Sequence, residues 1–549
     1  MSTISRRQFL SAAMTTVFLG SANSFALAGD VQTSNAVSAA TSNPTSPFSS
    51  ATCKRRLNVI NFIRGLEPRG PVDLFEPVKQ QLFLARKYNL PTTWLLQYCA
   101  MVQGPFTEFL KKELNKGDEL GFWFEMDQYL VEAAGLKWRS SIPWDYHVQH
   151  GFSIGYTQQE RVKMIDTAFG KFRELFGQYP VSCGSWFFDA FSLQYMYEKY
   201  GILASCNCRD QFGTDGYSLW GGYADGGYYP SKRNAFIPAQ TKENQVPVPV
   251  FRMLGSDPVD QFVHVGECRT MEPVWTGGQQ KWVDWFLKQN YQTPCLSMAY
   301  AQIGQENSFG WRGMKNGLEY QYPVVAEMAK RGEISLETLR DTGVWFKNQY
   351  ASTPAKGTYF PTASNDPERA AVWYFSARQR LGFYRDHDKF YLRDWRVFDE
   401  NQEEPFLNSA TRSNDCLYES LPIMDSSLWR PVDSVGLRFE REGQPVAVDI
   451  SDVREQGVTA LELDGQTSFG GLKIVCDENL LTIRFPSASF ALRYPNCQAN
   501  PTRRTVRADG IDFEYKGFRY ALRILKGSFN DQSNCFLPDK TGELSVEIA

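Results

Sequence analysis

The feature that most constrains this chain is the repeated alternation of short apolar strands with amphipathic helices over residues 54–360. Apolar runs at 57–63, 92–97, 120–125, 181–188, 202–206, 246–254 and 295–302 predict strands, with an eighth candidate at 334–339. Consecutive strand–helix units give parallel strands, because the right-handed helical crossover returns the chain to the end of the sheet at which the previous strand began. Seven or eight units predict a (β/α)7-8 barrel, and a doubly wound open sheet is the alternative.

One helix of this region is specified at both of its ends. Thr157 and Glu160 form a capping box, in which each side chain binds the backbone N–H of the other residue. Gly177 supplies the residue type that most easily adopts the left-handed conformation that ends a helix. The sequence therefore predicts a helix between these two signals.

The pattern changes after about residue 360. Short runs of alternating apolar and polar residues follow, separated by turn signals at Gly443, Asp464-Gly465, Gly470-Gly471 and Asp509-Gly510. This pattern is typical of antiparallel sheets with one buried face. Residues 361–549 are therefore predicted to form a β-sandwich.

The first 28 residues have the features of a twin-arginine secretion signal. Arg6-Arg7 is followed by Phe9-Leu10, an apolar stretch and the small-residue cleavage pattern Ala26-Leu27-Ala28. The alternative is an ordinary N-terminal helix. Residues 29–53, rich in Ser, Thr, Ala and Asn, predict a flexible leader. We expect a periplasmic or extracellular protein exported by the twin-arginine route, with no membrane span in its mature part.

Charge and cysteine content exclude several classes of partner and structure. Lys and Arg total 58 against 61 Asp and Glu, so the basic excess that phosphate binding requires is missing and nucleic acid is not expected as a partner. The cysteine count of 11 is odd, and a protein that folds before export folds in a reducing compartment. We therefore predict no disulfide framework.

Aromatic residues make up 14% of the chain, which suits sugar binding as well as an apolar core.

Three segments of residues 54–310 together are similar to one superfamily. Gly117-Asp-Glu-Leu-Gly121 resembles the G-H-E-I-G strand of polysaccharide deacetylases, and the helix from Tyr156-Thr-Gln-Gln-Glu160 resembles the helix after their metal motif. Gly177-Gln-Tyr-Pro180 and the stretch to Gly201 resemble their next strand–helix unit. In this order, the segments resemble the glycoside hydrolase/deacetylase superfamily of NodB-type (β/α)7 barrels, including its uncharacterised glycoside hydrolases. The resemblance implies this barrel and a carbohydrate-directed hydrolase.

The sequence departs from the deacetylase pattern at the expected metal ligands. Deacetylases carry two metal-binding histidines just after the third strand, where this chain has the segment 122–127 without histidine. The paired aspartates expected after the first strand are also missing, since that strand ends Arg64-Gly-Leu-Glu67. We therefore expect no cofactor in the main interpretation.

Carboxylates follow most of the predicted strands. Active sites of parallel barrels lie at the C-terminal ends of the strands, and glycoside hydrolysis uses two carboxylates. The resemblance to family 57 glycosidases, with a nucleophile after strand four and an acid after strand seven, implies Asp189 and Glu306. Glu125, after strand three, is the third catalytic candidate.

Each of these three carboxylates also has a structural interpretation. Asp189 could serve only as the N-cap of the helix that follows, and Glu306 could be a solvated loop residue. Glu125 could form an ion pair with Arg64 or Arg69.

Substrate-binding candidates are aromatic or charged residues at the strand ends and in a Gly-rich loop at 220–231. Aromatic faces could stack on sugar rings, and the charged groups could bind sugar hydroxyls. The alternative is an ordinary packed loop, with the aspartates as turn formers. The candidates are Arg64, Trp123, Trp186, Asp210, Asp215, Trp220, Tyr223, Tyr228 and Tyr229.

A candidate metal site is the one H-x-x-H pattern with a nearby aspartate, formed by Asp145, His147 and His150; these residue types can bind a transition metal.

Three hypotheses for the function follow. The first is a glycoside hydrolase with a carboxylate pair acting on an oligo- or polysaccharide. The second is a metal-dependent polysaccharide deacetylase-like hydrolase that uses these three residues. The third is a non-catalytic carbohydrate-binding protein on the same scaffold.

Overall fold

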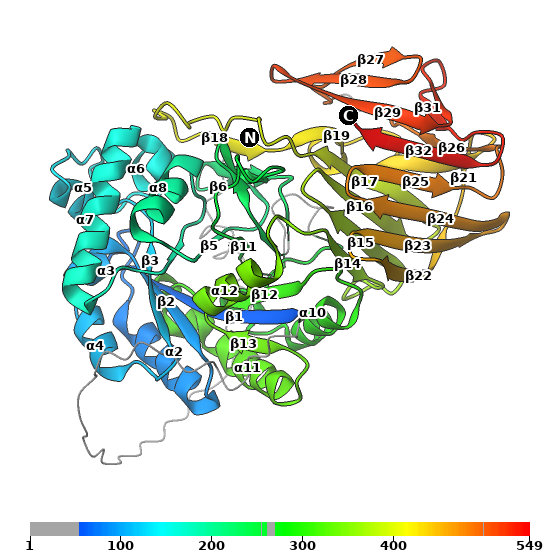
Figure 1. The fold of residues 1–549 in the computed structure, drawn as a ribbon. Helices are drawn as coiled ribbons and strands as arrows, with labels where there is room; N and C mark the ends of the chain where they lie inside the picture. Colours follow the sequence, from blue (N-terminus) through cyan, green and yellow to red (C-terminus); the bar gives the residue numbers. More distant parts are fainter. Residues whose placement is uncertain (1–53, 225, 254, 261–268, 498) are drawn as a thin grey trace.

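The computed structural model describes residues 54–549, apart from 225, 254, 261–268 and 498 (Figure 1). The predicted signal at 1–28 and leader at 29–53 lie outside the described residues. Among the described residues, every helix is too short or too polar to cross a lipid bilayer.

The N-terminal half is built on a curled sheet of parallel strands. Within the described residues its order is β12 (Ala299–Ile303), β1 (Arg55–Ile63), β2 (Thr92–Leu96), β3 (Glu119–Trp123), β4 (Ser182–Gly184), β5 (Ala204–Asn207) and β11 (Val250–Arg252). β13 (Ser335–Glu337) also pairs with β1, and β8 (Gly227–Tyr228) adds an antiparallel edge beside β11. The predicted α/β alternation is confirmed. No pairing between β11 and β12 is seen in the described residues, so the closure and type of the barrel stay a prediction.

Helices cover the outer face of this curled sheet (Figure 1). The longer ones are α2 (Phe75–Tyr88), α4 (Phe106–Glu113), α7 (Gln158–Phe176), α8 (Ala190–Tyr200), α10 (Gln280–Gln292), α11 (Gly310–Lys330) and α12 (Leu339–Gln349). Shorter ones are α3 (Tyr98–Val102), α5 (Gln128–Ala133), α6 (Val148–Gly151) and α9 (Pro273–Thr276). α7 begins at the predicted capping box of Thr157 and Glu160 and ends at Gly177, whose φ of 77° is left-handed.

Alternate residues of each strand point to opposite faces of the sheet, which separates two apolar cores. Leu57, Val59 and Ile63 of β1 pack with the outer helices. Phe62 faces inward, where its ring stacks on that of Trp123 at a centroid distance of 4.2 Å. Trp186 meets both rings edge-on, at 5.3 and 5.4 Å. These three aromatic side chains fill the interior of the curled sheet.

The C-terminal half consists of two antiparallel sheets. The first has the order β14 (Lys356–Phe360), β15 (Arg369–Phe375), β16 (Gln379–Asp386), β17 (Lys389–Val397), β20 (Leu437–Arg441), β26 (Phe490–Arg493), β31 (Cys535–Leu537) and β30 (Ser528–Asn530), with β19 (Leu421–Asp425) on β17 and β21 (Gln444–Pro445) on β20. The second has the order β22 (Asp449–Gln456), β23 (Ala460–Thr467), β24 (Gly470–Asp477), β25 (Leu480–Arg484), β32 (Glu543–Ile548), β29 (Phe518–Lys526), β28 (Gly510–Tyr515) and β27 (Arg503–Arg507). Buried side chains of both sheets, such as Phe383 and Leu463, form one core.

Buried ion pairs join the two halves. A strand from the second half, β18 (Cys416–Glu419), pairs with β7 (Tyr217–Trp220), which in turn pairs with β6 (Gln211–Thr214). Nearby, Asp210 binds Arg252 at 2.9 Å and Arg380 of β16 at 2.5 Å. Arg380 also binds Asp394 of β17 at 3.0 Å. Because breaking a buried pair leaves an uncompensated charge, these contacts hold the two halves in one arrangement.

Candidate active site

Three predicted site residues converge at the C-terminal ends of separate strands. Arg64 directly follows β1, Glu125 lies two residues after β3, and Glu306 lies three residues after β12. Arg64 binds Glu125 through two parallel bonds, Nε to Oε2 at 3.1 Å and Nη2 to Oε1 at 2.9 Å. Its third nitrogen, Nη1, donates to Glu306 Oε1 at 3.2 Å. One guanidinium therefore holds two carboxylates from distant parts of the chain. We call these three residues the Arg64 cluster.

The Arg64 cluster is buried among aromatic side chains. Arg64, Glu125 and Glu306 are 3%, 1% and 2% exposed. Phe62 and Trp123 precede Arg64 and Glu125 by two residues, so their rings face the same interior from below. The guanidinium of Arg64 also lies 4.3 Å from the ring centroid of Trp144. Trp144 thus packs on the guanidinium that holds the cluster together.

The charges of the Arg64 cluster do not balance, because two carboxylates share one guanidinium. Burial raises the pKa of Glu125; the positive charge of Arg64 opposes this rise, and the negative charge of Glu306 adds to it. Glu306 Oε1 accepts a hydrogen bond from Ser308 at 2.8 Å, but its Oε2 is buried without a partner in the described part of the chain. An unsatisfied buried polar atom costs about 1–3 kcal/mol. The fold thus retains an acidic oxygen that its own side chains do not satisfy.

Some residues that contact the Arg64 cluster were not predicted from the sequence. Gln97, which follows β2, places Nε2 3.5 Å from Glu125 Oε2. The strand-end rule would have found Gln97 if it had been applied to amides as well as carboxylates. Ser308 lies beside Glu306 in sequence but carries no separate signal. Nothing local in the sequence indicates that Trp144 packs on Arg64, since the contact joins remote segments.

Asp189 lies in a different network. Its Oδ1 accepts from the backbone N–H of Ser192 at 2.8 Å, which makes it the N-cap of α8, and from Arg161 Nη1 at 3.0 Å. Ser153 donates to Oδ2. No hydrogen bond or ion pair between described residues joins Asp189 to Arg64, Glu125 or Glu306. The contacts of Asp189 are thus those of an N-cap residue, which was its structural interpretation. Asp189 and Glu306 do not pair in this conformation.

The aromatic substrate-binding candidates are packed side chains. All six are buried, and Trp123 and Trp186 fill the interior of the curled sheet. The polar atoms of the other four bind the protein: Trp220 to Asp425, Tyr223 to the carbonyl of Pro354, Tyr228 to that of Ala235 and Tyr229 to that of Tyr350. The packed-loop alternative therefore describes these side chains. Trp220, Tyr223 and Tyr229 bind partners more than a hundred residues further along the chain.

The two aspartate candidates also have local roles. Asp210 is buried in the ion pairs that join the two halves of the chain. Asp215 occupies the turn between β6 and β7 with a left-handed φ of 48°, a conformation that aspartate tolerates better than most residues. The turn-former interpretation applies to Asp215, and neither residue is brought to the Arg64 cluster by a contact between described residues.

Asp145, His147 and His150 do come together, next to Trp144. His147 Nδ1 lies 2.5 Å from Asp145 Oδ1, and His150 Nδ1 lies 2.8 Å from Asp145 Oδ2. The two imidazoles are 39% and 19% exposed. One carboxylate and two imidazoles are a donor set that divalent transition metals accept, and their ligand atoms lie within 4.8 Å of one another.

Comparison with known proteins bears on the fold. No protein-family profile matches the sequence, and neither does any curated protein. Two solved structures, described as putative enzymes, are similar to it. A glycoside hydrolase/deacetylase from Parabacteroides distasonis matches with a TM-score of 0.53 and 15% identity, over 68% of this chain and 92% of its own. A polysaccharide deacetylase from Mycobacterium smegmatis matches with a TM-score of 0.35 and 12% identity, over 56% of this chain and 95% of its own.

The match to the Parabacteroides protein spans most of that structure, although the two sequences have diverged widely. It therefore bears on the arrangement of strands and helices and not on the chemistry of the site. The resemblance predicted from the sequence is confirmed at the level of the fold, which this chain shares with the Parabacteroides structure over 68% of its length.

Proposed function

We propose that this chain is an exported carbohydrate-active hydrolase, a glycoside hydrolase whose carboxylate pair is Glu125 and Glu306. The observation that carries the proposal is the convergence of these two carboxylates on Arg64, at the strand ends where parallel barrels bind substrate. The unsatisfied Oε2 of Glu306 supports it, because a ligand or water could bind there. Export through the segment 1–28 is part of the same proposal.

The electrostatics suggest a role for each carboxylate. Burial raises the pKa of Glu125, which favours the protonated form that a general acid needs. Glu306, whose Oε2 has no hydrogen-bond partner among the described residues, would act as the base or nucleophile. Arg64 would position both carboxylates. A substrate reaches the Arg64 cluster only if the segment carrying Trp144 moves away, since the cluster is buried.

The test uses isosteric variants and a control on the same strand. Glu125→Gln and Glu306→Gln should each lose turnover, measured as release of reducing sugar from a panel of polysaccharides. Glu119→Gln is the control, because Glu119 is a buried glutamate at the other end of β3, where its Oε2 accepts from the backbone N–H of Arg340 at 2.9 Å. Glu119→Gln should keep its turnover in the folded protein. Full turnover in both of the first two variants would reject the assignment.

A second candidate function rests on the cluster of Asp145, His147 and His150. With a divalent metal bound, this cluster would activate a water molecule for a metal-dependent, deacetylase-like hydrolysis. Metal analysis of the purified full chain, together with acetate release from acetylated glycans, tests this function. A stoichiometric transition metal that is lost in His147→Ala and His150→Ala would favour it over the carboxylate pair, and a metal-free active protein would exclude it.

A further inference from the structure

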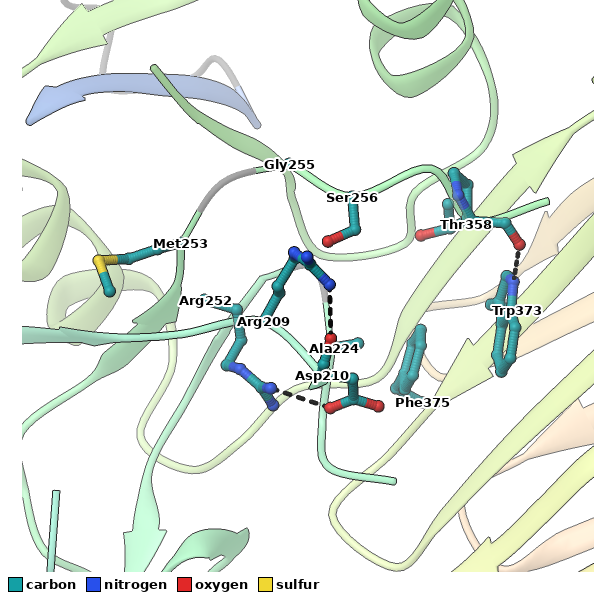
Figure 2. A pocket seen from close by; sticks show the side chains of 11 residues that line it. Arg209, Asp210, Ala224, Arg252, Met253, Gly255, Ser256, Thr358, Trp373 and Phe375 are labelled. Atoms are coloured by element: carbon teal, nitrogen blue, oxygen red, sulfur yellow. Dashed lines mark hydrogen bonds and ion pairs between the residues drawn. The ribbon is translucent and has the colours of Figure 1, made fainter. Parts of the chain in front are cut away.

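A pocket lies where the two halves of the chain meet (Figure 2). The lining comes from three parts of the chain. The first part is Arg209 and Asp210, just after β5, with Ala224 between β7 and β8. The second is Arg252 at the end of β11 with Met253, Gly255, Ser256 and Pro258 after it, and the third is Thr358 of β14 with Trp373 and Phe375 of β15. The pocket has about 470 Å³ of empty volume, including the part that opens to solvent. It thus combines the C-terminal ends of two parallel strands with one face of the first C-terminal sheet.

Two donors in this pocket have no acceptor among the described residues. Arg209 Nε and Ser256 Oγ are both buried and make no hydrogen bond. Arg209 Nη1 donates to the backbone carbonyl of Asp210 at 2.8 Å, which fixes one side of the guanidinium and leaves its Nε edge facing no carboxylate of the described chain. Guanidinium groups use this edge for paired bonds to carboxylates.

Asp210 cannot neutralise Arg209, because its oxygens already have partners. Oδ1 accepts from Arg252 at 2.9 Å, and Oδ2 accepts from Arg380 at 2.5 Å and from the backbone N–H of Gly221 at 3.1 Å. Asp394, the other carboxylate bound to Arg380, is shared with Arg396.

Arg209 therefore has no carboxylate partner among the described residues. The neighbouring guanidinium groups of Arg252, Arg380 and Arg396 are paired with Asp210, Asp394 and Asp425. An anionic ligand would supply the partner that Arg209 lacks.

An aromatic wall stands beside these donors. The rings of Trp373 and Phe375 are nearly parallel, with an interplanar angle of 9° and centroids 6.1 Å apart. The indole N–H of Trp373 donates to the backbone carbonyl of Pro258 at 2.8 Å, which fixes the ring against the segment that follows β11. An apolar wall next to the unpaired guanidinium edge of Arg209 and the hydroxyl of Ser256 suits a ligand with one apolar face and one anionic group.

We infer that this pocket binds the carboxylate of an acidic saccharide, a uronic acid residue, through Arg209 and Ser256. In calling the ligand a saccharide the inference rests on the proposed function. The carboxylate would accept from the Nε edge of Arg209 and from the Ser256 hydroxyl. It would bring the negative charge that Asp210 cannot supply. The ring of the sugar would lie toward Trp373.

The experiment measures binding to the full chain by titration calorimetry and needs no turnover. Glucuronate and galacturonate oligomers should bind, and glucose oligomers of the same length should bind much more weakly. Arg209→Gln should weaken uronate binding about 10- to 100-fold, the effect of losing a charged hydrogen bond. Arg503→Gln, at a residue whose side chain is 86% exposed, is the matched control and should bind as the unmodified chain does.

Two further arms separate the alternatives. Ser256→Ala should weaken uronate binding in the same direction, and it serves as the second variant if Arg209→Gln fails to fold. Acetate and inorganic sulfate report whether a free anion suffices. Equal binding of neutral and uronate oligomers, unchanged uronate affinity in folded Arg209→Gln, or binding of inorganic anions alone would overturn the inference.

The outcome can be told apart from that of the proposed function. Uronate binding is measured on Arg209→Gln and Ser256→Ala, whereas turnover is measured on Glu125→Gln and Glu306→Gln. If the carboxylate variants keep their turnover while Arg209→Gln loses uronate binding, the proposed catalytic pair fails and the pocket stands. If the carboxylate variants lose turnover but uronate never binds, the pocket fails and the catalytic pair stands.

Discussion

Arg64 binds both oxygens of Glu125, although the two residues lie 61 positions apart in the chain. The same guanidinium also binds Glu306, so removing Arg64 would leave two buried carboxylates without their positively charged partner. Removing one partner of a buried ion pair destabilises a protein by about 3–5 kcal/mol. We expect Arg64→Met to lower the free energy of unfolding by this amount, measured by urea denaturation at pH 7. Arg69→Met, which breaks the more exposed pair with Glu67, is the control and should cost less. A stability equal to that of the unmodified chain would contradict the prediction.

The stability deficit of Arg64→Met should depend on pH. Arg64 opposes the burial that raises the pKa of Glu125, so this pKa rises further when Arg64 is removed. A carboxyl with a raised folded-state pKa is stabilising when protonated, and this contribution is lost as pH rises through the folded value. The deficit should therefore shrink as pH is lowered from 7 toward the ordinary carboxyl range. Denaturation curves at several pH values test this, and a deficit that grows on acidification would refute it.

The rate of hydrolysis should fall on the alkaline side of the raised Glu125 pKa. A general acid works only while it is protonated, so kcat should decrease as pH rises through this value. The midpoint should lie above about 4.3, the usual pKa of a glutamate side chain. Glu125→Gln should lose this limb together with most of its activity. The pH dependence of kcat is the measurement, and an alkaline limb that survives in Glu125→Gln would assign it to another group.

Asp189→Asn should reduce stability without abolishing turnover. Burial acts to raise the pKa of Asp189, but the charge of Arg161 and the hydrogen bonds from Ser153 and Ser192 outweigh it, so the pKa is lowered. A lowered folded-state pKa stabilises above the unfolded value of about 3.9, and this contribution is lost as pH falls through the folded value. The variant should lose about 3–5 kcal/mol at pH 7 and progressively less in acid. Denaturation and turnover of the folded variant are the measurements. Loss of turnover at unchanged stability would restore Asp189 as a catalytic candidate.

Trp220→Phe should affect stability and leave glycan binding unchanged. The indole N–H donates to Asp425 Oδ2 at 2.9 Å, and a phenyl ring removes this bond to a charged group. Such bonds contribute about 1.5–3 kcal/mol. Thermal or urea unfolding measures the loss, and titration with oligosaccharides measures binding. Reduced sugar affinity at unchanged stability would mean that Trp220 is a stacking residue after all.

Local signals in the sequence predicted the elements that depend on neighbouring residues. The capping box of Thr157 and Glu160 places the start of α7 because both partners lie within one turn. Two prolines, Pro247 and Pro249, stand in the predicted strand at 246–254, and β11 begins just after them at Val250, because proline lacks the N–H that pairing needs. The rule that functional groups follow parallel strands also selected Arg64, Glu125 and Glu306.

Burial could not be predicted for the Gly-rich loop at 220–231. Its composition suits an exposed binding loop and a packed one equally well. The decision depends on Pro354, Tyr350 and Asp425, which accept from Tyr223, Tyr229 and Trp220 across 131, 121 and 205 residues. No periodicity within the loop reports such remote partners.

The sequence by itself determined the α/β alternation, the change to β-structure after about residue 360 and the strand ends from which site residues extend, because each depends on chemistry within a few residues. Tertiary structure alone decided which of those residues meet. Arg64 joins Glu125 and Glu306, while Asp189 is bound by Arg161, because curling of the sheet brings distant strand ends into contact. It also left Arg209 without a carboxylate partner among the described residues, since Arg252 and Arg380 already bind Asp210.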